Sequence, residues 1–427
     1  MLLISYFLLY IICLFSITLL VKGFLRGAIN AYYFIIPVLI IFYILPEVLD
    51  FLVGTKFIGP SSTYVMREAL LDEKTTIFYN IYISIILVLF SYLMVKSSSI
   101  GTENLKNQIY RFSILFKKYK YLYWALIFIP IILVFYTGSL DFYMDYTDRN
   151  RYEGPAVQGV ISKLVLASTL LSTLANLYYI KSINNNNSFK YLIPIFFISI
   201  LLLINFYLHG KRSIVVVFFM VQIAILFISK AVSRRKLSLI AVIFLLLTAV
   251  FMKLYGKNIE SGSSLLEVIT NLRVDFSRDY GVKFVIYHEL FNNNSVLPFK
   301  GASYLFLLTF FIPRSIYPEK PYPYAVYFTN SAFGNFGNDY LYGWGLTTSF
   351  LSESISNLGW FGLFAFPVFY ILLIRYISNI NSIFTHLLTY LVLVLLLLIQ
   401  PIAFMVLILL LILFLLKRNK KVVWKRI

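Results

Sequence analysis

Apolar residues along this chain gather in long unbroken runs that are separated by shorter polar segments. Each run has roughly 17–22 residues, the length that a helix needs to cross a hydrocarbon core of ~30 Å. Inside lipid the backbone must satisfy its own hydrogen bonds, and runs without period-two alternation favour helices over barrel strands. We therefore expect an all-α integral membrane protein with about eleven transmembrane helices. The predicted spans are 2–21, 30–49, 75–95, 121–140, 158–180, 191–208, 213–229, 237–254, 357–376, 384–399 and 400–416.

The spans are distributed unevenly along the chain. Residues 384–416 could form one bent helix or a tight hairpin, because Pro401 opens the helical ladder. Between the eighth and ninth spans lies a loop too long to lack structure or function of its own. Its apolar segment 302–312 is too short to span, so we expect it to be re-entrant or interfacial. The predicted organisation is a bundle of eight spans at 1–254, a large extracytoplasmic catalytic loop at 255–356, C-terminal spans at 357–416 and a basic cytoplasmic tail at 417–427.

Composition agrees with this picture, and charge orients it. The chain is 60% hydrophobic and 13% charged, whereas soluble domains are roughly a quarter charged. Its net charge of +19 arises because more than half of the 37 Lys and Arg residues fall in alternate interspan segments, with almost no acid beside them. Under the positive-inside rule those segments are cytoplasmic. The N-terminus and the large loop are then outside, in a bacterial plasma (inner) membrane, and the excess charge meets anionic lipid rather than nucleic acid.

Several other kinds of chemistry are not indicated. Cys13 is the only cysteine, and it lies in an apolar run, so neither a disulfide framework nor a thiolate metal site is expected. The three histidines have no metal-ligand spacing. We expect no metal and no cofactor. Residues 1–21 have no positively charged start and no small-residue cleavage site, so we interpret them as a retained first helix.

The first segment with candidate chemistry is the short outer turn between the sixth and seventh spans. It reads His209-Gly210-Lys211-Arg212-Ser213. Its two cations lie on the predicted outer side, whereas the positive-inside rule places most cations in cytoplasmic segments. Cations at the end of a bundle can hold a phosphate or pyrophosphate, and arginine can do so with two hydrogen bonds. The alternative is that both cations reach lipid headgroups.

A second segment pairs two arginines with two carboxylates in the large loop. Arg273 and Arg278 are interleaved with Asp275 and Asp279. On a helix the two aspartates share one face, and Asp275 can pair with Arg278. The alternative to a substrate site is a solvated amphipathic helix that pairs its own charges.

A third segment, at 311–321, is rich in proline and holds cations. Prolines at 313, 318 and 321 make it rigid and non-helical, which fixes Arg314 and Lys320 near Tyr317. Aromatic residues follow, ending at Trp344. Rings with polar edges suit the membrane interface or the faces of sugars, and we favour the interface.

A fourth segment leads into the ninth span. It contains Gly343-Trp344-Gly345, then Glu353, and then Asn357, Gly359 and Gly362. Glu353 is an acid just outside a span, where it could act as a general base. The alternative is that it only stabilises a helix N-terminus.

Together these four segments resemble the ordered motifs of bacterial O-antigen and oligosaccharide repeat-unit polymerases. The resemblance covers roughly residues 205–365 and rests on the GKR turn, the paired arginines, PRSIYPEKP and the G-x-G-L-T-x-S-F-L-x-E…N-x-G-x-x-G run. The chain departs from the family's pattern in having Lys211 before the arginine of the turn and Trp344 within the glycine run. Neither departure removes an arginine or the acid.

The resemblance implies a metal-independent glycosyltransferase that polymerises repeat units carried on undecaprenyl pyrophosphate. In that reaction arginines stabilise the leaving pyrophosphate and a carboxylate takes the proton of the acceptor hydroxyl. We expect Glu353 to be the base, with Asp275 and Asp279 as alternatives whose arginine neighbours lower their basicity. The partners implied are the lipid-linked oligosaccharide, membrane lipid, a flippase and a chain-length regulator. The expected catalytic residues are Glu353, Arg212, Arg314 and Arg278, and the expected substrate-binding residues are Lys211, His209, Arg273, Asp275, Lys320, Tyr317 and Trp344.

Two other functions stay open at this point. A glycan ligase that uses the same lipid-linked donor would show the same arginines and topology. A flippase or transporter of lipid-linked oligosaccharides would need polar residues within its spans, and Lys163 and Arg375 lie near span ends. No internal repeat is visible, which also counts against a transporter built from duplicated halves. The product, whether capsule, lipopolysaccharide O-antigen or another polysaccharide, is left open.

Overall fold

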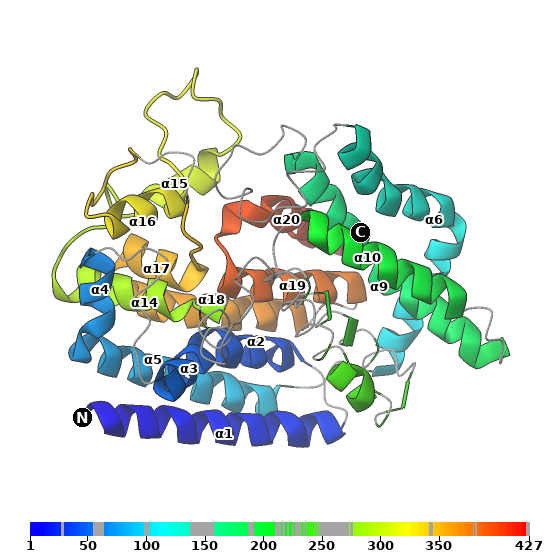
Figure 1. The fold of residues 1–427 in the computed structure, drawn as a ribbon, viewed down its shortest axis with the longest axis horizontal. Helices are drawn as coiled ribbons and strands as arrows, with labels where there is room; N and C mark the ends of the chain where they lie inside the picture. The colour runs from blue at the N-terminus through cyan, green and yellow to red at the C-terminus, as the bar shows by residue number, and fades with distance from the viewer. Residues whose placement is uncertain are drawn as a thin grey trace, which may run out of the picture. The chain divides into compact units, whose positions relative to one another are not determined.

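The computed structural model describes most of the chain, and every regular element in the described part is helical (Figure 1). The described residues are those outside 27–29, 54–63, 98–101, 137–157, 187–191, most positions within 210–272, 274–275, 341–344, 379, 381 and 424–427. In this part of the chain, five helices are long and apolar enough to cross a membrane. The chain is thus an all-α protein of membrane type, as its apolar runs predict.

The long apolar helices coincide with predicted spans. Three shorter apolar helices, at Ile193–Leu208, Thr385–Leu398 and Pro401–Leu416, match three further predictions, while the predicted spans 213–229 and 237–254 lie mostly outside the described residues. The five candidate spans are α1 (Leu2–Arg26), Tyr32–Phe51 (within α2, Tyr32–Leu39, η1, Ile40–Ile44, and α3, Leu45–Val53), α5 (Glu73–Lys96), Phe116–Tyr136 of α6 (Thr102–Tyr136) and α18 (Trp360–Ser378).

The chain folds as two compact units, and the second is inserted into the first. The first unit contains Met1–Ile100 and Leu265–Ile427, and the second contains Gly101–Ser264. The second unit has its own apolar core, to which α6, α9 (Gln158–Asn186) and α10 (Leu192–His209) contribute Ile127, Val165 and Phe206. The first unit joins the first three spans to the large loop and the C-terminal helices, so the residues of the candidate site that are described in detail belong to it.

Polar side chains align α1 with α5. Asn80 Nδ2 donates to Ser5 Oγ at 3.1 Å, and Ser91 Oγ donates to Ser16 Oγ at 2.9 Å. In each pair the two residues are 75 positions apart in the sequence, so the two helices run parallel and keep the same register along their length. Near the other end of α5, Asn30 Nδ2 donates to Met94 O at 2.9 Å, which brings the start of α2 to the end of α5. Hence α2 runs antiparallel to its two neighbours.

Buried tyrosines attach the C-terminal helices to this core. Tyr82 of α5 donates to Leu363 O of α18 at 2.9 Å, and Tyr370 of α18 donates to Leu393 O of α19 at 2.8 Å. Helix α19 (Ile383–Leu398) ends at extended backbone, and a 3₁₀ turn (Pro401–Phe404) leads into α20 (Met405–Val423). The predicted run 384–416 is therefore two helices that break next to Pro401.

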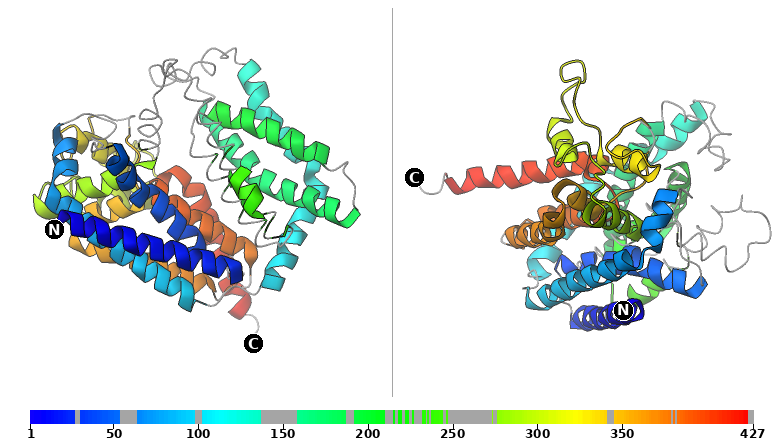
Figure 2. Two further views of the ribbon diagram at one scale, coloured as in Figure 1. Left: turned by 60° about the horizontal axis from the view of Figure 1, so that its bottom comes forward. Right: turned by 90° about the vertical axis from the view of Figure 1, so that its left-hand side faces the viewer.

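The large loop forms short helices that pack on one end of this bundle (Figure 2). They are α14 (Asp279–Val285), continued by the π-helical η3 (Ile286–Phe291), then α15 (Ala302–Thr309), α16 (Tyr324–Ala332) and α17 (Phe350–Leu358); α4 (Tyr64–Leu71) joins them from the N-terminal part. Every residue of α16 is buried, including Tyr324, Tyr327 and Phe328. The expectation that these rings form an interfacial belt is wrong for these three, because the loop needs them for its own core.

Candidate functional site

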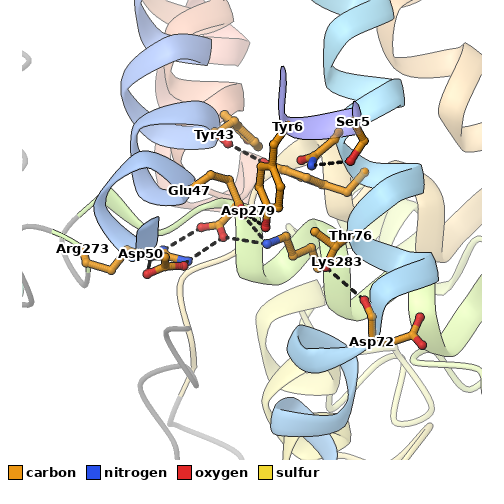
Figure 3. A network of polar contacts seen from close by, with 12 residues as sticks. Ser5, Tyr6, Tyr43, Glu47, Asp50, Asp72, Thr76, Arg273, Asp279 and Lys283 are labelled. Carbon is orange, nitrogen blue, oxygen red and sulfur yellow. Dashed lines mark hydrogen bonds and ion pairs between the residues drawn. The ribbon is translucent and has the colours of Figure 1, made fainter. Parts of the chain in front are cut away.

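Arg273 lies at the centre of a buried ionic network where the loop meets the bundle (Figure 3). Its Nε and Nη2 donate to the two carboxylate oxygens of Asp50 at 2.7 and 3.0 Å. Its Nη1 and Nη2 donate to the two oxygens of Asp279 at 2.8 and 2.7 Å. Planar guanidinium groups favour such two-point contacts. With only 3% of Arg273 exposed, a substrate can reach it only by displacing a carboxylate.

Lys283, one turn after Asp279 on α14, extends the network to Glu47, near the end of the second candidate span. Its Nζ donates to Glu47 Oε1 and lies 3.7 Å from Asp279 Oδ2. Glu47 Oε2 accepts from the Tyr6 hydroxyl of α1 at 3.1 Å. The Lys283 ammonium also lies 5.2 Å from the ring centroid of Tyr79 on α5, within cation–π range. One lysine thus contacts two segments of the bundle, α3 and α5, directly, and is connected to α1 through Glu47.

The network has three carboxylates and two cations, all of them largely or fully buried. Burial opposes ionisation of Asp279, but Arg273 and Lys283 outweigh it and hold the pKa of this carboxyl below its usual value. The sequence-based expectation that arginine lowers the basicity of Asp279 is therefore confirmed. The arrangement is neither solvated nor confined to one helix, because Asp50 and Glu47 come from α3.

The π-helical segment η1 supplies a backbone carbonyl that binds the start of α14. In η1 the wider winding replaces the i→i−4 hydrogen-bond pattern of an α-helix. Two carbonyls of η1 accept hydrogen bonds from other segments: Phe42 O from Arg278 N at 3.2 Å, and Tyr43 O from the Tyr79 hydroxyl at 2.7 Å. The segment leads directly into α3, which carries Glu47 and Asp50.

Arg278 connects the start of α14 to two other helices. Its Nε donates to Leu398 O at the end of α19 at 2.7 Å, and its guanidinium lies 5.7 Å from the ring centroid of Phe42. The last carbonyls of a helix lack partners within the helix, and positive charge is favourable beside them. Arg278 therefore acts in this structure as a cap for α19.

Glu353 sits in a different environment, on the buried face of α17. Ser303 Oγ of α15 donates to Glu353 Oε1 at 2.7 Å, and Asn357 Nδ2 donates to the same hydroxyl oxygen at 2.8 Å. The other carboxylate oxygen, Oε2, is buried without a hydrogen-bond partner among the described residues, and Asn357 Oδ1 is in the same condition. Within the described part of the chain no cation forms an ion pair with Glu353.

Burial without a counter-ion changes the acidity of Glu353. Only 1% of the residue is exposed, and burial raises its pKa to about 7 while the Ser303 hydrogen bond opposes the rise. A carboxyl group that titrates near neutral pH can both accept and release a proton under physiological conditions. This property separates Glu353 from Asp279, which arginine and lysine keep ionised.

Two glycines position α17 against the span that follows it. Gly359 ends α17 with φ = 59°, a left-handed conformation that side chains other than hydrogen disfavour. A Cβ at Gly362 would lie 2.2 Å from Ser354 O, so only glycine lets α18 begin so close to α17. The N-x-G-x-x-G motif thus has a local physical reason, and it holds Glu353 at the mouth of a candidate span.

The two cations of the proline-rich loop, Arg314 and Lys320, donate hydrogen bonds to backbone carbonyls of the same loop. Arg314 donates to Pro318 O at 3.3 Å and Pro321 O at 3.0 Å, and its guanidinium stacks 3.7 Å from the ring centroid of Tyr322. Lys320 Nζ donates to two carbonyls of residues 310 and 312, each at 2.9 Å. Arg314 stays half-buried, whereas Lys320 is 7% exposed. Half-buried Tyr317 donates its backbone N–H to a turn within the same loop.

Other predicted site residues are not covered. Lys211, Arg212, Asp275 and Trp344 lie outside the described residues. His209 is the last residue of α10 and belongs to the second unit. Within the first unit the structure brings Arg273, Arg278 and Asp279 to one end of the bundle, with Glu353 on the neighbouring α17.

Sequence reasoning assigned no role to five of the residues described here: Glu47, Asp50, Lys283, Ser303 and Asn357. Glu47 carried a usable signal, because an acid within an otherwise apolar span is costly and needs a partner. Ser303 carried no such signal, since a serine in an apolar stretch is common. Comparison with known proteins adds no assignment: no protein-family model, no curated protein and no solved structure matches the chain.

Proposed function

We propose that this protein polymerises oligosaccharide repeat units carried on undecaprenyl pyrophosphate, at the outer face of a bacterial plasma membrane. The observation that carries the proposal is Glu353, a buried acid without an ion pair in the described residues, whose pKa is raised to about 7. It lies on the motif that most resembles the polymerase family, directly before a helix able to cross a membrane.

The reaction assigns distinct tasks to the groups described above. The acceptor hydroxyl oxygen forms a bond to the anomeric carbon of the donor while the bond from that carbon to the pyrophosphate oxygen breaks. Glu353 takes the hydroxyl proton, and the leaving pyrophosphate keeps the electron pair. Developing negative charge needs fixed donors, which Arg314 and Arg212 supply in this proposal. Arg314 suits the task because Tyr322 and two carbonyls already hold it in place.

The proposed topology is the full set of eleven spans with the large loop outside. The position of the loop at one end of the bundle is supported by the first unit, where Glu47 and Asp50 of α3 contact Lys283 and Arg273 of the loop (Figure 3). An outer position would bring Glu353 near substrates that are anchored in the outer leaflet. The basic loops would then face the cytoplasm.

The burial of Glu353 sets a requirement on the mechanism. Ser303 of α15 covers one oxygen of this carboxylate. Because only 1% of Glu353 is exposed, an acceptor hydroxyl can approach it only after a packed neighbour moves. In this proposal the short apolar helix α15 opens the site, and the unpartnered Oε2 atom is the one that receives the proton.

The proposal is tested with the purified full-length protein and a synthetic lipid-linked repeat unit. A ladder of products of increasing length is expected, and one transfer to a separate acceptor would instead indicate a ligase. In Glu353→Gln we expect polymerisation to fall ~10²–10⁴-fold with donor binding nearly unchanged.

Glu289→Gln is the matched control for Glu353→Gln. Glu289 is also buried with a raised pKa, because burial outweighs the opposing ion pair with Lys300. It lies outside the motif that carries Glu353 and keeps a cation beside it. Equal loss of activity in both variants would assign the defect to folding and reject Glu353 as the base.

A further inference from the structure

The end of α15 and the loop that joins it to α16 expose large apolar side chains. Leu308 is 72% exposed, Phe311 is 70% exposed and Ile316 is 75% exposed. Such side chains in one short segment are unusual for a water-facing loop and indicate a contact with lipid or protein. Both end-on and side views show the yellow segment after α15 projecting sideways from the helices of its unit (Figures 1 and 2).

The direction of this projection favours lipid. The candidate spans of the first unit run roughly side by side, and a bilayer that they cross would lie perpendicular to them (Figure 1). A segment that leaves the unit at right angles to the spans therefore runs along the plane of that bilayer. It leaves from the end of the unit where the loop helices pack.

Many backbone polar groups of the loop already have partners within the protein, as an environment with little water requires. Non-helical backbone in lipid is costly unless its polar groups have partners. Lys320 and Arg314 together satisfy four carbonyls of the loop, and prolines at 313, 318, 321 and 323 have no N–H groups to satisfy. Turn hydrogen bonds engage further groups, such as Ile316 N and Tyr317 N, which both donate to Pro313 O at 3.1 Å.

We propose that the loop 308–323 is immersed in the outer interface of the bilayer, with Leu308, Phe311 and Ile316 in contact with lipid. Lys320 acts there as an internal donor that keeps the turn compact. Arg314, which is half-buried and stacked on Tyr322, lies at the depth of lipid phosphates, where a cation is attracted to anionic headgroups. The inference rests on the proposed topology but not on the proposed reaction.

The consequence is an entry site for a lipid-anchored substrate. A pyrophosphate on a membrane anchor sits at the headgroup depth, the same level as Arg314. Under the proposed function, which this consequence alone requires, the loop contacts the donor from the bilayer side and not from the water side. The chemistry recognised is a polyanionic headgroup attached to a long apolar chain.

Spin labels measure the immersion directly. In a Cys13→Ala background, single cysteines at Phe311 and Ile316 are labelled with a nitroxide, and the full-length protein is placed in vesicles of phosphatidylcholine and phosphatidylglycerol. Oxygen concentrates in lipid, whereas a water-soluble nickel complex does not. We expect both labels to collide at least several-fold more often with oxygen than with the nickel complex. A label at Asn294, which is exposed on another loop, should show the reverse.

Two results of the labelling would overturn the inference. A label at Ile316 that the nickel complex reaches as readily as one at Asn294 places the loop in water. A label shielded from both reagents places it against protein, such as a second copy of the chain. Adding Lys320→Met should increase access of the nickel complex to Ile316, and unchanged access would remove Lys320 from the account. Because no turnover is needed, an inactive enzyme with lipid-exposed labels would refute the polymerase proposal and leave this inference standing.

Discussion

The Ser303 hydroxyl donates a 2.7 Å hydrogen bond to one carboxylate oxygen of Glu353, fifty residues further along the chain. Asn357, one turn after Glu353, donates to the same hydroxyl and so fixes the direction in which it points. A serine that receives one hydrogen bond and gives another acts as a relay between an amide and an acid. The contact makes the acidity of Glu353 dependent on α15.

Ser303→Ala should raise the pKa of Glu353 above about 7, because the lost hydrogen bond stabilises the ionised form. The acidic limb of the rate profile then moves to higher pH, and the carboxyl C=O infrared band persists to higher pH in the protein without substrate. Tyr304→Phe is the matched control, since Tyr304 donates to Ser354 and not to Glu353. A uniform loss of rate without a shift in the profile would show that Ser303 is only structural.

Glu353 should also make stability depend on pH. Its pKa is about 7 in the folded protein against a usual value of 4.5, so the folded state holds a proton that the unfolded state has lost between these values. Stability is full below pH 4.5 and falls as pH rises through 7, by about 3 kcal/mol. Glu353→Gln should therefore unfold at a higher temperature than the wild type at pH 8, and at a similar temperature at pH 4.5. Equal curves at both pH values would contradict an uncompensated buried acid.

Breaking the Glu47–Lys283 pair should destabilise the first unit strongly. Removing one member of a buried ion pair leaves the other uncompensated and typically costs about 3–5 kcal/mol. We expect Lys283→Met to lower the unfolding temperature in detergent, and Glu47→Gln combined with Lys283→Met to recover a large part of it. Additive losses in the double variant would show that the two residues act independently.

Arg314→Lys tests whether a planar guanidinium is required. Lysine keeps the charge but loses the stack on Tyr322 and the two-point geometry. Loss of one donor to a developing charge typically lowers a rate ~10²–10³-fold. Arg67→Lys serves as the control, because Arg67 is exposed on α4 and is not part of the proline-rich loop. Normal polymer lengths in Arg314→Lys would indicate that any cation near the headgroups suffices.

Thiol labelling in whole cells checks the topology. With Cys13 replaced, cysteines at Lys118 and Lys420 should resist an impermeant reagent, and cysteines at Asn150 and Asn293 should react. The charge distribution along the chain requires this result. Reaction at Lys118 would invert the assignment and move the site to the cytoplasm.

The membrane helices were predictable because hydrophobic composition over about twenty residues is sufficient to define them. The break before Pro401 was predictable for a similar reason, since proline acts locally. The ionic network could not be predicted, because Asp50 and Arg273 are 223 residues apart in the sequence. Hydrophobic periodicity specifies which face of a helix is buried, but not which residue that face contacts. The π-helical η1, which prepares Phe42 O for Arg278, has no recognised signal in its apolar sequence. Glu353 was found from its motif, but its burial under Ser303 required the structure.

The ionic network also has a consequence for how the protein is made. Glu47 and Asp50 enter the membrane region early in synthesis, whereas Lys283 and Arg273 are added more than two hundred residues later. Until then the second helix carries two carboxylates without their cations, and the whole inserted unit 101–264 is synthesised in the interval. A chain that ends before residue 273 therefore has an acidic helix without these cationic partners. Arrival of α14 marks the point at which these two carboxylates gain their cations.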